Sequence, residues 1–220
     1  MTGGTRTRFF YHLHVICIRG FFIPAFLAAL LSASGVESAA GESASRFIHQ
    51  LGNQTIQTLH AADLTHAQRE SRFRNMLAER FDLAFIGRFV MGKYWRMATP
   101  EQQDTYLALF GEYILQTYSA RLEGYASQSM TVLGERQAND KDTVVSMAIA
   151  GSSGPAIIAN WRVRATADGY RIIDVAVEGI SLAITHRSEF SAVVKRHGID
   201  GLLTTLRDHT ATTQTTASLY

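Results

Sequence analysis

Apolar residues recur every three to four positions from Ser45 to about Tyr125, which is the spacing of amphipathic helices. The first helix is predicted from one such row: Phe47, Ile48, Leu51, Thr55, Ile56 and Leu59. A second helix is expected to start at Thr65, because Thr65 and Gln68 have the spacing of a capping box. Asp82 is a candidate cap for a third helix that ends near Gly92.

The sharpest helix-start signal is Thr99-Pro-Glu-Gln102. Threonine can cap the helix, proline suits the first helical position where no amide donor is needed, and glutamine can reach back to the cap. A long helix is therefore expected from here, with an aromatic-rich buried row: Tyr106, Leu109, Phe110, Tyr113, Ile114 and Tyr118. Such a row is typical of a plain core and also fits a ligand site.

After Gly124 the apolar spacing changes to two, which is the period of strands. Four segments alternate in this way, with the following apolar positions: Met130 and Val132; Val145, Met147 and Ile149; Ile157, Ala159, Trp161 and Val163; Ile173, Val175 and Val177. Turn residues separate them at 139–140 and 167–169. We expect an α+β fold in which four antiparallel strands turn one face to the helices and carry Asn160, Arg162 and Arg164 on the other.

The two ends of the chain have a different composition. Arg6, Arg8 and Arg19 precede an uninterrupted apolar run from Phe21 to Leu31. Small residues are frequent between this run and Ala40. This pattern is typical of a secretory signal peptide, and the run is shorter than the ~20 residues of a spanning helix. Residues 1–40 are therefore predicted to be cleaved during export to the periplasm, with an uncleaved anchor as the alternative. Residues 209–220 are threonine-rich, and a flexible tail is expected there.

Charge and cysteine content narrow the class of protein. The chain has 21 Lys and Arg residues and 19 Asp and Glu residues; residues 1–40 hold three of the former and one of the latter, which leaves 18 of each. A formally neutral remainder without a basic run does not suggest a nucleic-acid-binding protein. Cys17 is the only cysteine, so an exported form would be stabilised by its core rather than by disulfides. Residues 41–208 are long enough for one such domain.

Catalytic and metal-binding patterns are weak. No pair among the histidines at 49, 60, 66, 186, 197 and 209 has a metal-ligand spacing with a third donor nearby, so no metal site is predicted. Ser181 lacks the second glycine of a nucleophile elbow. Asp174 stands among apolar strand residues, where a carboxylate could serve as a base, although a structural role fits such a residue better.

Four segments together resemble the MlaC or toluene-tolerance family of periplasmic phospholipid carriers. They are Phe81–Gln102 with its Gly-Lys-Tyr-Trp-Arg and Thr-Pro-Glu-Gln, Thr117–Ala120, Tyr170–Asp174, and Val177-Glu-Gly-Ile-Ser-Leu182. Tyr170 replaces a tryptophan that is usual in the family, and His186 replaces an aromatic residue before Arg187. A hopanoid-associated branch, HpnM, shares much of the pattern, so it is an alternative, as is an enzyme on a related cavity fold that uses Asp174 as its base.

The resemblance implies a fold and a function. The fold would be a helical layer on a curved four-stranded antiparallel sheet, similar to nuclear-transport-factor-two-like and cystatin-like folds, with a lipid pocket between the layers. The function would be that of a monomeric, non-enzymatic carrier with phospholipid as cargo and no cofactor. It would shuttle lipid between an outer-membrane lipoprotein complex and an inner-membrane ABC transporter with MCE domains, and so maintain outer-membrane asymmetry.

The period and the resemblance together give a set of candidate site residues. Lipid contacts are predicted for Phe81, Phe85, Phe89, Trp95, Phe110, Tyr113, Ile114, Tyr118, Val132, Met147, Trp161, Val163, Ile173, Val175 and Val177. Structural roles are predicted for Asp174 and Arg187. The guanidinium of Arg187 is expected to bridge the last strand and the helices, because a planar guanidinium can satisfy several acceptors at once.

Overall fold

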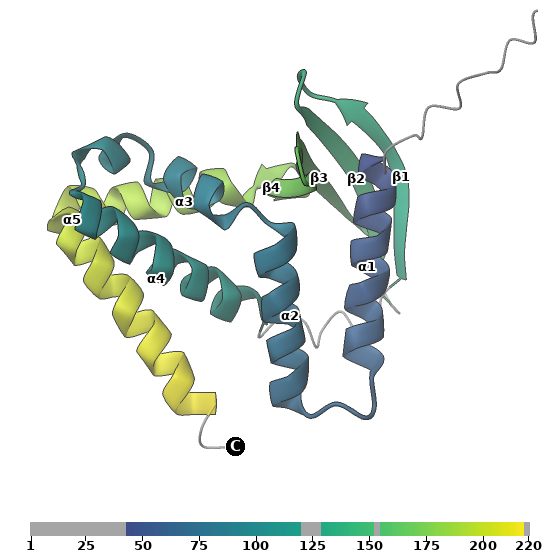
Figure 1. The fold of residues 1–220 in the computed structure, drawn as a ribbon, viewed down its shortest axis with the longest axis horizontal. Helices are drawn as coiled ribbons and strands as arrows, with labels where there is room; N and C mark the ends of the chain where they lie inside the picture. The colour runs from purple at the N-terminus through teal and green to yellow at the C-terminus, as the bar shows by residue number, and fades with distance from the viewer. Residues whose placement is uncertain (1–42, 120–128, 152–154, 218–220) are drawn as a thin grey trace, which may run out of the picture. The chain divides into compact units, whose positions relative to one another are not determined.

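The structure, a computed structural model, describes residues 43–119, 129–151 and 155–217. The predicted signal peptide and its cleavage site lie outside these residues. The helical elements are α1 (Ala44–His60), α2 (His66–Arg80), α3 (Leu83–Met91), the 3-10 helix η1 (Gly92–Met97), α4 (Pro100–Ser119) and α5 (Leu182–Ala217). The strands are β1 (Ser129–Gln137), β2 (Asp142–Ala150), β3 (Ile157–Thr166), β4 (Gly169–Val177) and β5 (Ile180–Ser181) (Figure 1).

Local capping explains where the helices begin. The Thr65 hydroxyl accepts from the Gln68 amide at 3.3 Å, and the Thr65 amide donates to the Gln68 side chain at 2.8 Å. Thr99 and Gln102 exchange the same pair of bonds at 3.2 and 3.1 Å. The Asp82 carboxylate accepts from the Phe85 amide at 2.9 Å. All three predicted helix starts are therefore confirmed, because each depends on residues within one turn of the chain.

The strands form one curved antiparallel sheet in the order β1-β2-β3-β4-β5. The α+β class is confirmed, but the prediction of four strands was one too few. Glu178 and Gly179 both have positive φ angles, 49° and 80°, and return the chain so that Ile180 pairs with Val177. The Gly-Ile-Ser segment therefore adds a fifth, two-residue strand, which the period-two spacing did not indicate.

A β-bulge changes which residues of β4 face the core. Arg162 pairs with Asp174, but Val163 pairs with Ile172, so Ile173 is an additional residue opposite β3. Beyond the bulge the alternation is shifted by one residue. Ile172, fully buried, therefore packs with Val163 against α1, and the prediction that Ile173 shares the face of Val175 is wrong.

Apolar side chains gather in three clusters. One joins α1 to the sheet and includes Phe47 and Val145. A second lies among α3, η1, α4 and α5 around Tyr106 and Phe110, both fully buried. A small third cluster joins α2 to α4 through Phe73, Leu77 and Leu115. Phe81 packs against all three clusters, and the amide of the next residue, Asp82, donates to the Ile172 carbonyl at 2.9 Å.

The last helix, α5, extends into the residues for which a flexible tail was expected. Gly198 has a φ of 73°, a conformation that favours glycine, and breaks α5 into two helical segments (Figure 1). Helix continues past His209 to Ala217, where a flexible tail was expected. Thr210 is buried, and its carbonyl accepts from Gln116 of α4 at 3.2 Å, a long-range contact that composition cannot reveal. Within the described residues, no helix has the length and apolarity needed to cross a membrane.

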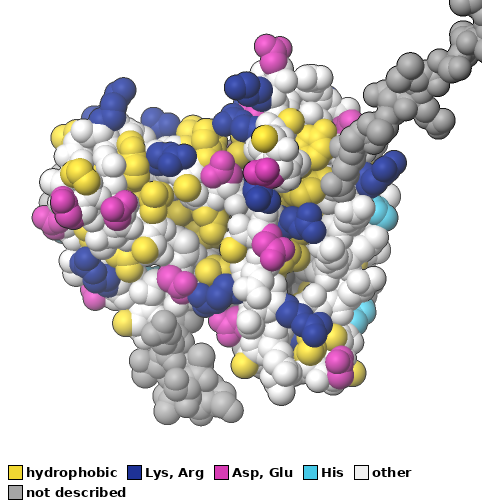
Figure 2. All heavy atoms as spheres, in the orientation of Figure 1, with side chains coloured by type: hydrophobic (Ala, Val, Ile, Leu, Met, Phe, Trp, Pro, Cys, Tyr) yellow, Lys and Arg dark blue, Asp and Glu magenta, His cyan; other side chains and the backbone are white. Residues whose placement is uncertain are grey.

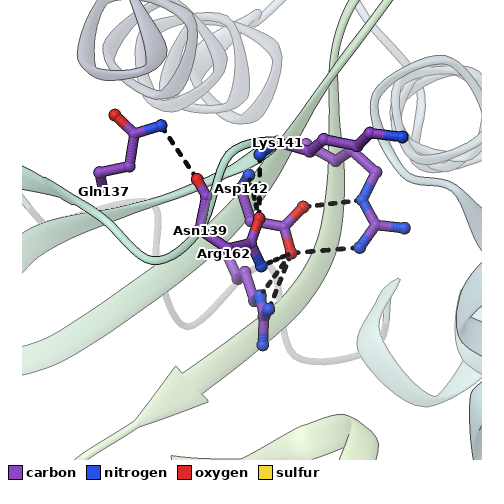
Figure 3. Close-up of polar contacts among 6 residues, drawn as sticks. Gln137, Asn139, Lys141, Asp142 and Arg162 are labelled. Atoms are coloured by element: carbon purple, nitrogen blue, oxygen red, sulfur yellow. Dashed lines mark hydrogen bonds and ion pairs between the residues drawn. The ribbon is translucent and has the colours of Figure 1, made fainter.

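A buried carboxylate near the β1–β2 turn binds the arginine side chains on the polar face of the sheet. Asp142 is fully buried and accepts from both guanidinium groups predicted to lie on that face, Arg162 at 2.7 and 3.1 Å and Arg164 at 2.7 and 3.1 Å (Figure 3). The Asn139 amide adds a bond of 3.0 Å. These donors hold the pKa of the Asp142 carboxyl well below its usual range, the bonds from Arg164 being the largest cause. Arg164 also lies 4.4 Å from the centre of the Phe85 ring, so the cluster links the sheet to α3.

Candidate functional site

A cavity of about 390 Å³ lies between the sheet and the helices. Its wall is overwhelmingly apolar and draws on α1 to α5 and on β1 to β4. The apolar lining residues are Ile48, Leu51, Gly52, Phe73, Met76, Leu77, Phe81, Leu83, Ile86, Ile114, Met130, Met147, Ile149, Ala159, Trp161, Val175, Val177, Leu182 and Ala183. On the face drawn in Figure 2, hydrophobic side chains also gather over α3 and α4 beside α2.

Seven of the predicted lipid-contact residues line this cavity. They are Phe81, Ile114, Tyr118, Met147, Trp161, Val175 and Val177. The strand residues among them share the face that alternation assigned to the helices. Phe81 contributes from the α2–α3 junction, where its ring meets the Trp161 ring edge-on at a centroid distance of 6.4 Å. The expectation of a space between a helical layer and a sheet thus agrees with the position of these side chains.

The other predicted contact residues lie elsewhere. Phe110 and Trp95 pack in the helical cluster with Tyr106, and Tyr113 packs against Phe190 of α5. Phe85 and Phe89 lie under the guanidinium groups of Arg164 and Arg187. The remaining strand residues outside the cavity wall are Val132, Val163 and Ile173. These residues lie outside the wall of the described cavity, and lipid contact by them stays a prediction. A helical period identifies an apolar face without telling whether that face meets another helix or a cavity.

Two groups of lining residues were missed by the sequence reasoning. One is the α1–α2 hairpin, which contributes residues such as Leu51 and Met76. The other is the first turn of α5, with Leu182, Ala183 and His186. The apolar row of α1 was visible in the sequence, but its contact with the sheet face was not. The sequence contains a stronger indication that residues 182–186 lie at the cavity wall, because the last strand leads directly into a helix there.

The few polar groups of the wall are concentrated at the start of α5. His186 is buried; its Nε2 lies 3.0 Å from the Tyr118 hydroxyl and its Nδ1 3.0 Å from the Glu189 carboxylate. Asp174 lies on the neighbouring strand, and Thr55 is the only other polar lining residue among those described. Its hydroxyl donates to the Leu51 carbonyl of its own helix at 2.9 Å. The cavity is thus apolar toward α1 and α2 and polar toward α5.

Asp174 has a structural role in the local fold. Its carboxylate accepts from the Ser181 hydroxyl at 2.6 Å and from the Ala183 amide at 3.2 Å. Ser181 in turn accepts from the Ile184 amide at 3.1 Å, so the two side chains together cap α5. Both carboxylate oxygens are engaged, which favours the structural interpretation of Asp174 over that of a general base.

Arg187 occupies a different position from the one expected. Its guanidinium lies 5.0 Å from the centre of the Phe89 ring and packs against Gly92, where an added Cβ would be 3.0 Å from Nε. Among the described residues it makes no hydrogen bond to the last strand. The side chain therefore joins α5 to α3 by stacking and does not bridge to the sheet. In the same described part of the chain, no group of three or more His, Cys, Asp or Glu side chains could hold a metal ion.

Known proteins share both the sequence pattern and this architecture. Residues 49–208 match the profile of the MlaC protein family. The chain belongs to the MlaC family. It is 25% identical over 138 residues to the intermembrane phospholipid transport system binding protein MlaC of Haemophilus influenzae, a match that covers 61% of this chain and 64% of that one. It is 28% identical over 108 residues to toluene tolerance protein ttg2D of Pseudomonas putida, covering 49% of this chain and 50% of that one.

The matched regions thus span less than two thirds of each of these two relatives. A solved structure, the phospholipid-binding protein from Ralstonia solanacearum in complex with a phospholipid, has the same fold. Its TM-score is 0.69, with 23% identity over 78% of this chain and 99% of that one. The α+β architecture and the resemblance to the MlaC or toluene-tolerance family are therefore confirmed.

Proposed function

We propose that this MlaC family member is a periplasmic phospholipid carrier and that the cavity holds the acyl chains of its cargo. The observation that carries the proposal is the wall of the cavity, in which nearly every described side chain is apolar. Burial contributes about 0.8 kcal/mol for each acyl CH₂ group. Transfer of a diacyl lipid through water is therefore very unfavourable without a protein that covers its chains. The family membership supports the same function.

We further propose how the lipid is oriented. The wall formed by α1 and α2 offers Leu51, Met76 and Leu77 to the acyl chains, whereas Tyr118, His186 and Asp174 lie toward α5. Polar groups of a lipid lose less hydration free energy beside these polar side chains than against the largely apolar wall of α1 and α2. The glycerol esters and headgroup are accordingly assigned to the α5 end.

The partners follow from the resemblance. Residues 1–40 would direct export and be removed, and the carrier would exchange lipid with an outer-membrane lipoprotein complex and with an inner-membrane ABC transporter that carries MCE domains. In this proposal it catalyses no reaction, because the only carboxylate in the described cavity wall, Asp174, is already engaged by two donors. Release of intact lipid to vesicles that contain the transporter, with no release to bare vesicles, would test this exchange.

The two tryptophans provide a direct test of the cavity. Trp161 lines it, whereas Trp95 packs in the helical cluster. We expect a phospholipid brominated on its acyl chains to quench Trp161 fluorescence in Trp95→Phe and to leave Trp95 fluorescence nearly unchanged in Trp161→Phe. Equal quenching of both, or quenching of Trp95 alone, would refute the assignment of the cavity. Headgroup-brominated lipid should quench Trp161 less than chain-brominated lipid if the orientation is correct.

A further inference from the structure

A second hollow, distinct from the cavity, lies on the outer side of α3 and α5. It is an open groove of about 700 Å³ lined by Phe89 of α3 and by one face of α5 that includes Ile184, Arg187, Ser191, Lys195 and Arg196. Ile184, Arg187, Ser191 and Lys195 are three or four residues apart and form one continuous stripe, and Arg196 lies next to Lys195 at its end. From Ile184 to Arg196 the stripe extends about 18 Å at 1.5 Å per residue. Among the described residues, the groove lining includes three cationic side chains and no acidic one.

The elements around the groove are unusually basic for this chain. The elements α3, η1 and α5 contain seven Lys or Arg residues, at 88, 93, 96, 187, 195, 196 and 207, and three acidic residues, at 189, 200 and 208. Glu189 pairs with His186 at 3.0 Å. Outside residues 1–40 the chain has equal numbers of basic and acidic residues, so this excess is local. The basic excess arises because two segments about a hundred residues apart in sequence pack together. For that reason the sequence shows no run of basic residues.

Apolar side chains are exposed beside these charges. Ile184 is 57% exposed and Phe89 37% exposed. The Arg187 guanidinium lies over the Phe89 ring, which holds this charge at the edge of the groove. Between the cations the stripe carries the small residues Ser188, Ser191 and Ala192. The result is a concave, small-residue floor with apolar and cationic edges.

We propose that this groove docks an acidic, amphipathic helical segment of a partner protein. Carboxylates of such a segment would meet Arg187, Lys195 and Arg196, and its apolar residues would meet Phe89 and Ile184. A flat anionic bilayer would contact the protruding side chains but leave the concave floor unfilled, so the shape favours a peptide segment. Ile86 and His186 of the same two helices line the cavity on their inner side, so the docked segment would lie one helix away from the cargo.

The test uses the protein without residues 1–40 and a fluorescent two-heptad peptide with Glu on one face and Leu on the other. A peptide with Lys in place of Glu is the ligand control. The groove variant is Lys195→Glu/Arg196→Glu. The matched control variant is Arg136→Glu/Lys141→Glu, which changes net charge by the same amount at two exposed residues of the β1–β2 hairpin. Fluorescence anisotropy gives Kd at low and high salt.

We expect the Glu peptide to bind more tightly than the Lys peptide, and the groove variant to weaken Glu-peptide binding about tenfold while the hairpin variant changes it less than about twofold. High salt should weaken binding to the wild type more than binding to the groove variant. Equal effects of the two variants, or no preference between peptides, would overturn the proposal. The proposal would also be overturned if the wild type binds no peptide but does bind phosphatidylglycerol vesicles, and the groove variant loses that vesicle binding. The groove would then contact a membrane.

Thermal unfolding and native mass spectrometry of the groove variant separate this inference from the proposed function. The substituted residues are exposed and lie outside the cavity, so the melting temperature and the bound lipid should both be retained. A groove variant that keeps its lipid and still binds the Glu peptide as well as the wild type refutes the docking site alone. A wild-type protein without lipid that nevertheless binds the peptide through the groove refutes the carrier function alone.

Discussion

Replacement of Asp142 by Asn should destabilise the protein by about 2 kcal/mol at neutral pH. The carboxylate is fully buried and accepts five hydrogen bonds, four of them from Arg162 and Arg164. Removing one partner of a fully buried ion pair costs about 3–5 kcal/mol. The arginine side chains are 44% and 28% exposed, however, so water can compensate part of the loss. Asn also keeps one acceptor oxygen, and both effects lower the expected cost.

The pH dependence of this variant follows from the lowered pKa of Asp142 in the folded protein. Its unfolded pKa is about 3.9. A carboxyl whose pKa is lowered by folding stabilises the fold above the unfolded pKa, and this contribution is lost as pH falls through the folded pKa. The gap in stability between wild type and Asp142→Asn should therefore be constant from about pH 7 to pH 5 and shrink below about pH 4.

Urea unfolding of the two proteins across this pH range measures the gap. Thermal unfolding should show a fall in Tm of about 4–8 °C at pH 7, given ~2–4 °C per kcal/mol for a domain of this size. Asp140→Asn, an exposed change in the same turn, is the matched control and should alter neither quantity. If Asp142→Asn unfolds within about 0.5 kcal/mol of wild type at pH 7, the account of a buried anchor is incorrect.

Other substitutions test single features of the fold and the cavity. Thr99→Ala should cost about 1 kcal/mol in urea unfolding by removing the cap of α4, and no loss would show that the capping bond contributes nothing. Gly92→Ala should lower the free energy of unfolding by about 1–3 kcal/mol because φ is +58° there. Gly111→Ala, in open space on α4, should raise it by about 0.5–1 kcal/mol. The same sign for both variants would refute the backbone argument. Ala159→Phe fills the cavity and should abolish binding of a fluorescent phospholipid. Ala148→Phe, on the neighbouring strand and outside the cavity wall, should retain binding. Loss of binding in both variants would point to general unfolding.

Features set within one turn of the chain could be predicted from the sequence. The caps at Thr65, Asp82 and Thr99 and the alternation of Met147 with its neighbours are of this kind. Features that depend on tertiary contact could not. The helical row that contains Phe110 and Ile114 is visible in the sequence, yet Phe110 is buried in the helical core and Ile114 reaches the cavity.

Irregularities of the backbone caused a second group of differences. The bulge on β4 takes Ile173 out of the alternation with Val175 through a single additional residue, although its side chain remains buried, and no sequence signal marks it. The basic groove depends on the packing of α3 against α5, so a search for runs of like charge did not find it. In each of these cases the residue types were recognised correctly, while their neighbours in space came from distant parts of the chain.

Native mass spectrometry of the protein purified gently from cell envelopes tests the central claim most directly. We expect a mass above that of the polypeptide by one diacyl phospholipid, released intact when the complex is activated or extracted with organic solvent. Release of a hopanoid would place the protein with the alternative branch, and release of hydrolysed lipid would favour an enzyme. A spectrum that contains only the polypeptide mass, from a protein that remains folded, would contradict the proposal that the cavity carries phospholipid.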